Sequence, residues 1–149
     1  MRAIAWSLPA LAWIGLIAWF STKSWGGDET GELVEQILRV VWPSLLERLS
    51  ASQLETINFL VRKVAHFVEY AVLASLIVLA VVRGFGRSIG KALIVGFLLA
   101  VVVATADEIH QALVPNRTGN PLDIVLDATG AAFACVLIRS RSIRRAVAR

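Results

Sequence analysis

Apolar residues gather in four long stretches of the chain, at about 3–20, 59–82, 92–113 and 121–138. A helix that spans a bilayer needs roughly 20 residues, with a range of about 17–25. All four stretches reach that length, the third only when its polar end is included. The pattern therefore predicts four transmembrane helices.

The segment between the first two stretches, 21–58, follows a different pattern. A polar loop leads into Leu33–Leu49, where apolar residues recur at helical spacing. This pattern predicts an amphipathic helix that is bent at Pro43. Such a helix could lie flat in the membrane interface or pack over the bundle, and the sequence leaves both open.

Short motifs indicate where the helices start. Ser52 and Glu55 fit a capping box that begins the second helix near Gln53. Asn120 and Pro121 fit the N-cap and first position of the fourth helix.

Proline and glycine indicate where helices end. Pro115 should close the third helix at or before Val114, because the residue before a proline avoids helical geometry. Gly84 and Gly86 should break the chain after the second helix.

Composition supports a membrane protein. Apolar residues make up 57% of the chain, against about 45–50% in soluble domains, and the mean hydropathy is +0.70. The first stretch could also be a signal peptide, but its length and terminal tryptophans favour a retained span. The single cysteine, Cys135, excludes an intramolecular disulfide and suits a small core or lipid-facing residue.

Charge is divided between the two sides of the predicted membrane. Four spans place the N-terminus, the loop 83–91 and the C-terminal tail 139–149 on one side, and that side is basic without any Asp or Glu. All eleven acids fall on the other side. The positive-inside rule then predicts that both termini are cytoplasmic. The net charge is +4, but the basic residues lie at the ends of the apolar stretches, and this distribution argues against nucleic-acid binding.

Chemically versatile side chains converge on the outer ends of the helices. They are Lys63, His66, Glu69 and Tyr70 on the second, Asp107, Glu108, His110 and Gln111 on the third, Asp123 and Asp127 on the fourth, and Arg117 in the last loop. Charged residues within spans normally face a bundle interior or a water-filled cavity. We therefore expect one polar pocket, open to the outer leaflet, where the carboxylates lie near Lys63, His66 and Arg117.

Simpler interpretations stand beside this pocket. Arg62 and Lys63 could extend to the interface, Asp123 could only cap its helix, and His110 is expected to face solvent. Glu69 and Asp127, paired with basic residues, could be structural salt bridges between helices. Gly130 shares a helix face with Asp127 and would allow close helix approach.

The ordered polar motifs resemble the VanZ-like family. The matching residues are Lys63-x-x-His66-Phe67-x-Glu69-Tyr70, Asp107-Glu108-x-His110-Gln111, Pro115-x-Arg117 and Asp123-x-x-x-Asp127-x-x-Gly130. The resemblance covers about 10–138. Asp127 departs from the Asn that many relatives carry, which makes the expected pocket more acidic.

The resemblance implies a multi-pass protein of the bacterial cytoplasmic membrane. The founding member of that family is associated with resistance to the glycopeptide teicoplanin, without the enzymes that rebuild the peptidoglycan precursor. Many relatives occur far from resistance clusters, so the resemblance leaves open whether this chain confers resistance.

Three function classes remain. The first is a binding protein whose outer pocket holds a membrane lipid, a lipid-linked sugar or an amphiphilic antibiotic. Cationic side chains would hold phosphate or carboxylate groups, and apolar helix faces would hold acyl chains. The expected ligand-binding residues are Lys63, Tyr70, Glu108, Gln111, Arg117, Asp123 and Asp127.

The second class is a membrane hydrolase or transferase that acts on an outer-leaflet head group. Glu69 and Asp107 would be its acid and base, with His66 as proton shuttle. A divalent metal is a further alternative, because His66 and Glu69 share a helix face near Asp107, Glu108 and Asp123. No complete catalytic motif is present.

The third class is a structural helper subunit whose polar network only fixes the packing. Transport is disfavoured, because the inner halves of the helices carry few polar residues that could form an ion path. The expected fold is therefore an all-α integral membrane bundle of four transmembrane helices, a single domain over 1–149, with an amphipathic helix between the first two. The oligomeric state is open.

Overall fold

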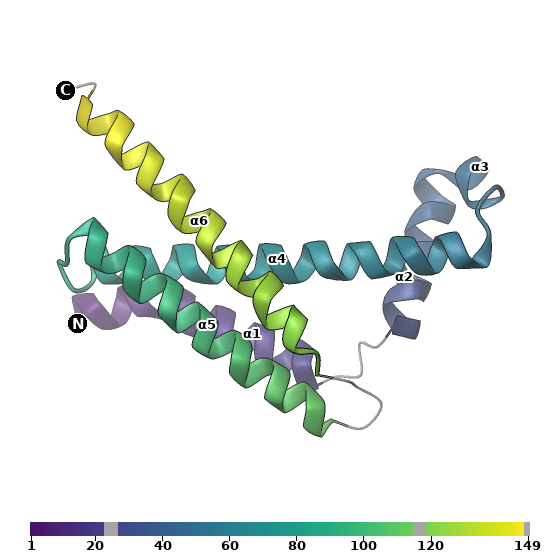
Figure 1. The fold of residues 1–149 in the computed structure, drawn as a ribbon, viewed down its shortest axis with the longest axis horizontal. Helices are drawn as coiled ribbons and strands as arrows, with labels where there is room; N and C mark the ends of the chain where they lie inside the picture. Colours follow the sequence, from purple (N-terminus) through teal and green to yellow (C-terminus); the bar gives the residue numbers. More distant parts are fainter. Residues whose placement is uncertain (23–26, 115–118, 148–149) are drawn as a thin grey trace.

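The computed structural model describes residues 1–22, 27–114 and 119–147. Every element within these ranges is an α-helix, as predicted. They are α1 (Arg2–Thr22), α2 (Gly27–Val41), α3 (Pro43–Leu46), α4 (Ala51–Arg83), α5 (Ile89–Leu113) and α6 (Pro121–Val147). Figure 1 shows α4 running the length of the molecule, with α6 crossing over it.

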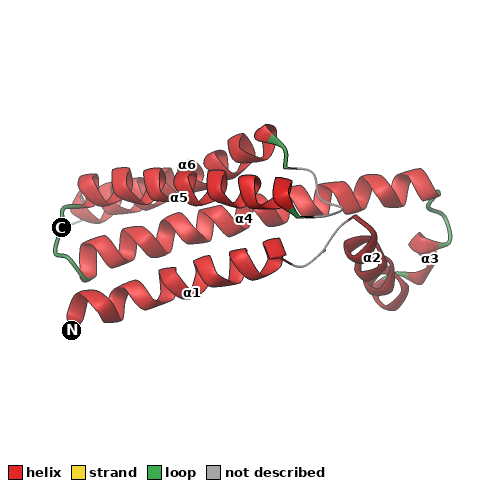
Figure 2. Ribbon diagram, turned by 90° about the horizontal axis from the view of Figure 1, so that it is seen from below, coloured by secondary structure: helices red, strands yellow, loops and turns green. Residues whose placement is uncertain are grey.

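The two ends of the bundle differ in what they carry. Figure 2 places both termini and the turn between α4 and α5 at one end, which we call the basic end. The other end carries α2, α3 and the start of α6, and we call it the acidic end. It follows that α4 and α6 run in the same direction, from the acidic end to the basic end.

Among the described residues, four helices are long and apolar enough to cross a membrane. These are the four that the apolar pattern predicts, namely α1, α4, α5 and α6. The 33 residues of α4 extend for about 50 Å at the usual helical rise, whereas the apolar core of a bilayer is about 30 Å thick. The helix is therefore longer than the apolar core, and α2 and α3 lie beside its first turns (Figure 2).

Large apolar side chains cover the outside of the bundle. Leu11, Leu98 and Phe133 are each more than half exposed, on α1, α5 and α6 respectively. A soluble monomer rarely exposes so much contiguous apolar surface. A lipid environment accounts for it.

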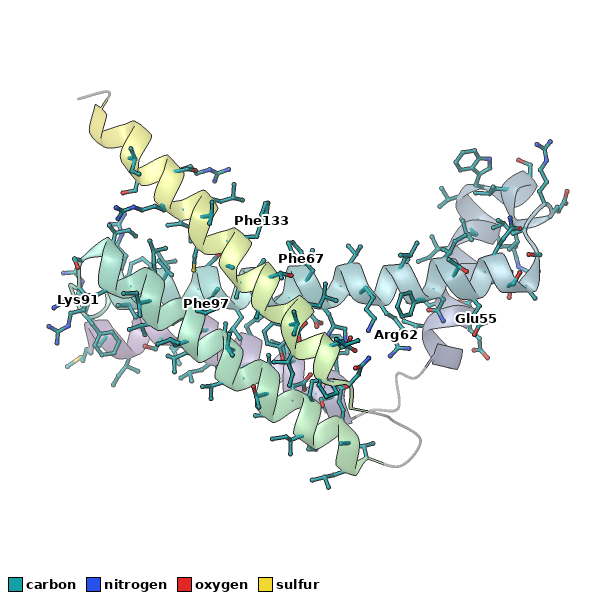
Figure 3. The ribbon with its side chains drawn as sticks, in the orientation of Figure 1. Glu55, Arg62, Phe67, Lys91, Phe97 and Phe133 are labelled. Carbon is teal, nitrogen blue, oxygen red and sulfur yellow. The ribbon has the colours of Figure 1, made fainter. Side chains whose placement is uncertain are left out.

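The interior is packed mainly by small residues. Its fully buried members are Tyr70, Leu73, Ala74, Ala100, Ala104 and Ala131. Small residues let helix backbones approach closely, which is the main source of packing between helices in membranes. A Cβ on Gly130 would lie 2.2 Å from the carbonyl oxygen of Phe67, so the close helix approach expected at Gly130 is confirmed, and the structure shows that the partner is α4. Phe67 and Phe133 lie side by side at this crossing, with ring centroids 5.6 Å apart (Figure 3).

Most predicted helix ends are confirmed. The helix α5 ends at Leu113, α4 ends at Arg83, and Gly86 has a φ of +64° that favours glycine. The Asn120 side chain accepts a hydrogen bond from the Leu122 N–H at 3.0 Å, as an N-cap should.

The capping box predicted for the second helix is wrong by two residues. Ser50, not Ser52, is the N-cap of α4, and its partner is Gln53 rather than Glu55. The Ser50 hydroxyl accepts from the Gln53 N–H, and the Gln53 side chain accepts from the Ser50 N–H at 2.8 Å. Ser50 and Gln53 fit the same S-x-x-E/Q pattern, so the spacing alone did not choose between the two boxes.

The amphipathic segment also differs from the prediction. It forms two helices, because the chain leaves helical geometry at Trp42, the residue before Pro43. The helix α2 packs on α4 through Val34, which is buried, and leaves Val40 and Val41 largely exposed. It therefore packs on α4 and still has apolar surface available for a membrane interface. The expected C-terminal tail is helical to Val147, as a continuation of α6.

Candidate functional site

Two pairs of side chains join α4 to α6 at the acidic end. The Lys63 ammonium forms an ion pair with the Asp123 carboxylate. One turn deeper, His66 Nδ1 lies 3.4 Å from Asp127 Oδ1. The helices run in the same direction, so the step from Lys63 to His66 on α4 lies beside the step from Asp123 to Asp127 on α6. One turn further along α6, Gly130 contacts Phe67 at the crossing.

A second set of hydrogen bonds fixes α5. Gln111 donates to the Asp107 carboxylate at 2.8 Å, one turn away on the same helix. The Asn120 backbone N–H donates to Glu108 Oε2 at 2.7 Å. Gly119 lies so close that a Cβ there would be 2.4 Å from the Glu108 carbonyl oxygen. The start of α6 is therefore attached directly to α5.

The helix α1 closes the remaining side. Ser21 and His110 Nδ1 share a hydrogen bond of 3.0 Å, and the indole N–H of Trp13 donates to the Glu69 carbonyl at 3.0 Å. His110 is exposed, as expected, but it also fastens α5 to α1. Neither the Ser21 nor the Trp13 contact was predicted.

Several buried polar atoms at this end have no hydrogen-bond partner among the described residues. They are Tyr70 Oη, His66 Nδ1, Glu108 Oε1 and both carboxylate oxygens of Asp127. Tyr70 and Asp127 are 0% exposed, and Glu108 is 4% exposed. Native proteins satisfy more than about nine in ten buried polar groups, so such a concentration at one place makes it the candidate functional site.

A pocket of about 250 Å³ opens beside these groups, between α1, α2, α4 and α5. Its lining includes apolar residues, among them Ile17, Phe20 and Leu33. Its polar lining residues are Ser21, Thr30, Arg62, His66, Glu69, Asp107 and Gln111.

The predicted site residues fall into two groups. His66, Glu69, Asp107 and Gln111 line the pocket. Lys63, Tyr70, Glu108, Asp123 and Asp127 are not among its lining residues and lie in the packed region between α4, α5 and α6. His66 belongs to both groups, because it lines the pocket and approaches Asp127. Arg117 lies outside the described residues.

Some lining residues were not predicted as part of the site. Arg62 lies on α4 between its crossing with α6 and its contact with α2 (Figure 3). The spacing of residues 62, 66 and 69 places it on the pocket face and could have identified it. Thr30 and Leu33 come from α2, and the sequence contains no signal for where α2 lies against the bundle.

Three side chains of this end could hold a metal ion. Ligand atoms of His66, Glu108 and Asp127 all lie within 4.8 Å of one another, each from a different helix. The set expected from the sequence also contained His66 and Glu108, but its other members were Glu69, Asp107 and Asp123. In the structure, Asp127 takes their place.

A comparison with protein-family models identifies the family. The VanZ/LLP1 model matches residues 6–144, which is nearly the whole chain, and the chain belongs to that family. No curated protein and no solved structure is similar enough to count as a match.

Proposed function

We propose that this VanZ/LLP1-family membrane protein binds an amphiphilic ligand, such as a lipid or a lipid-linked sugar, by its polar head group. The observation that carries the proposal is the mixed lining of the pocket. Its apolar residues suit an acyl or isoprenoid chain, and its polar residues suit a head group that hydrogen-bonds and carries charge.

The position of the pocket suits a ligand that arrives through the membrane. Counted back from Arg83, about 20 residues of α4 cover the apolar core of a bilayer, which puts His66 and Glu69 at its outer boundary. A head group lies at that depth while its chain remains in the apolar region. The exposed apolar residues of α2, among them Ile37 and Val40, would hold this helix in the interface beside the pocket.

The proposed orientation follows from charge. Arg2, Arg83, Arg87 and Lys91 gather at the basic end, so the positive-inside rule puts that end and both termini in the cytoplasm. The pocket then faces the outer leaflet of the bacterial cytoplasmic membrane. Lipid-linked cell-wall precursors and amphiphilic glycopeptides such as teicoplanin are candidate ligands on that side.

Arg62 is the best candidate for holding an anionic head group. It lines the pocket, whereas the Lys63 ammonium is already paired with Asp123. A guanidinium can hold a phosphate or carboxylate with two parallel hydrogen bonds. Glu69, Asp107 and Gln111 would accept or donate hydrogen bonds to sugar hydroxyls.

A second candidate function is hydrolysis or group transfer at the bound head group. It is favoured by the two carboxylates on the pocket wall, Glu69 and Asp107, with His66 between the pocket and Asp127. Glu69 and Asp107 would be acid and base, and His66 would move the proton. A purely structural role is the remaining alternative.

Lipid retention tests the proposal. The full chain would be purified in a mild detergent and its bound lipids measured by native mass spectrometry, for the wild type, Glu69→Gln and Asp107→Asn. Glu55→Gln is the matched control, since Glu55 is exposed on the same helix as Glu69. We expect the wild type and the control to retain the same amphiphile, and the two pocket variants to retain at least about tenfold less while they stay folded.

Equal retention by all four proteins would contradict ligand binding in this pocket. Equal retention with lower thermal stability of the two pocket variants would favour the structural role. Conversion of the retained lipid by the wild type alone would favour the enzyme.

A further inference from the structure

Three ligating side chains meet between α4, α5 and α6, next to the pocket. His66, Glu108 and Asp127 each come from a different helix, and one ligand atom of each lies within 4.8 Å of the other two. Glu108 and Asp127 are buried, and His66 is partly buried because it also lines the pocket.

Most polar atoms of this cluster have no hydrogen-bond partner within the part of the chain that the structure describes. They are both oxygens of Asp127, Oε1 of Glu108 and Nδ1 of His66, and the neighbouring hydroxyl of Tyr70 is in the same position. A buried carboxylate must be paired, hydrogen-bonded or bound to a metal, because its separation from water is otherwise strongly unfavourable. A single cation between the three side chains would satisfy all of these charged groups together.

Charge at this end favours a cation. Asp123 and Asp107 both interact electrostatically with Asp127, and Asp107 also interacts with Glu69. Lys63 offsets only part of this negative charge, because it is paired with Asp123. The excess negative charge lies where the helices enter the membrane and where water screens it poorly.

The separation of the ligand atoms fits a metal better than a hydrogen bond. His66 Nδ1 and Asp127 Oδ1 are 3.4 Å apart, whereas N–H···O hydrogen bonds are usually about 2.7–3.2 Å long. In a tetrahedral site with metal–ligand bonds of about 2.1 Å, neighbouring ligand atoms are about 3.4 Å apart. The separation of this pair is therefore compatible with two atoms that bind the same ion, and the three ligand atoms together lie within 4.8 Å of one another.

We propose that His66, Glu108 and Asp127 bind one divalent metal ion, and that Zn²⁺ is the ion that fits this site best. One imidazole with two carboxylates is a donor set that suits zinc or manganese. Three protein ligands leave a coordination position open, as in catalytic rather than structural zinc sites. Because His66 also lines the pocket, this position would be available to a phosphate or carboxylate of a bound head group. That last step rests on the proposed function, whereas the metal site does not.

The surroundings hold the three ligands in place. Glu108 uses its other oxygen, Oε2, to accept from the Asn120 N–H, which leaves Oε1 for the ion. Gly130, one turn after Asp127, brings α6 against Phe67, the residue after His66. Carboxylates that bind a metal are typically held in this way by a hydrogen bond to another group.

Metal titration of the full chain tests the site. The protein would be purified in detergent, stripped with EDTA, and titrated with Zn²⁺ and Mn²⁺ in competition with a coloured chelator. We expect one ion per wild-type chain, and at least about tenfold weaker binding by Asp127→Asn and by Glu108→Gln. Asp123→Asn is the matched comparison, since it removes the same charge one turn away on α6 without removing a proposed ligand, and it should weaken binding clearly less than Asp127→Asn does.

Two readouts separate lost binding from lost folding. Zn²⁺ should raise the unfolding temperature of the stripped wild type, a measurement that needs no variant. Co²⁺ bound to the wild type should give a visible absorption band that Asp127→Asn lacks. The circular dichroism spectrum of Asp127→Asn should equal that of the wild type, which would show that the variant is folded.

The proposal is overturned if the wild type binds no Zn²⁺ or Mn²⁺ at about 100-fold excess over a micromolar protein concentration. It is also overturned if Asp123→Asn weakens binding as much as Asp127→Asn. Because these titrations use no lipid, their failure would leave the lipid-retention result standing, and failure of lipid retention would leave the metal site standing.

Discussion

The two halves of the bundle are held together in different ways. In the half near the basic end, helices meet through small apolar residues such as Ala74, Ala100 and Gly96. In the half near the acidic end, the same helices also meet through His66, Glu108 and Asp127, several of whose buried polar atoms have no hydrogen-bond partner among the described residues. The small apolar contacts stabilise the fold, whereas the burial of these unpaired atoms opposes it.

This difference indicates where function lies. A membrane protein can bury small apolar residues at little free-energy cost, but a buried carboxylate without a partner is unfavourable in any fold. Such groups persist when something other than stability requires them. The pocket lies next to them, on the same half of the molecule.

The largest expected effect concerns helix contact in the two halves. Gly130→Ala should lower the free energy of unfolding by about 2–3 kcal/mol, because its Cβ would meet the backbone oxygen of Phe67 at 2.2 Å. Gly96→Ala should cost less, about 1 kcal/mol, since its Cβ would meet a Val78 methyl at 2.6 Å and a backbone oxygen, that of Ala74, only at 3.1 Å. Unfolding of both variants in detergent measures the difference, and equal losses would contradict it.

The next effect has the opposite sign. Asp127→Asn should raise the free energy of unfolding of the metal-stripped protein by about 1–2 kcal/mol, because it removes a buried charge and keeps the volume of the side chain. Unfolding in EDTA would measure it, with Glu55→Gln as a neutral control. A clear loss of stability would show that Asp127 stabilises the fold after all, and that the acidic end resembles the rest of the bundle.

A smaller effect is expected for the ion pair at the acidic end. The Lys63 and Asp123 side chains are only 25% and 14% exposed. A double-mutant cycle with Lys63→Gln and Asp123→Asn should give a coupling of about 1 kcal/mol. The same cycle for Arg39 and Glu35, which are 68% and 45% exposed on α2, should give about 0.3 kcal/mol. A coupling that is no larger for Lys63 and Asp123 would mean that water reaches this pair freely.

The smallest effect concerns the part of α4 beyond the membrane. Ser50→Ala should destabilise the first turn by about 0.5 kcal/mol, because the hydroxyl caps the Gln53 N–H. Ser52→Ala should change it less, because Ser52 is not the N-cap. Hydrogen exchange of the first amides of α4 would measure both, and a larger effect at Ser52 would restore the capping box predicted from the sequence.

The sequence predicted the fold well because a membrane imposes strong periodic constraints. Long apolar stretches, Pro115 and the pair Gly84 and Gly86 were enough to locate the four spans. The prediction was weaker outside the membrane. Two overlapping capping patterns competed at the start of α4, and a helix expected to bend at Pro43 is interrupted at Trp42.

The candidate site was predicted in part. Helical spacing placed His66, Glu69, Asp107 and Gln111 at one end of the bundle, and these four line the pocket. Spacing within one helix gives no distance between helices, however. The ion pair of Lys63 with Asp123 and the separation of Asp127 from the pocket lining depend on how α6 crosses α4.

The sequence by itself determined which segments span a membrane and which end of each span is polar, because both are properties of a single helix in water or lipid. Only the tertiary structure decided which polar groups meet. The close approach at Gly130 sets the register of α6 on α4, and that register pairs Lys63 with Asp123 and brings Asp127 to His66 and Glu108. The physical reason is that contacts between helices depend on their separation and rotation, which the packing of all the side chains fixes together.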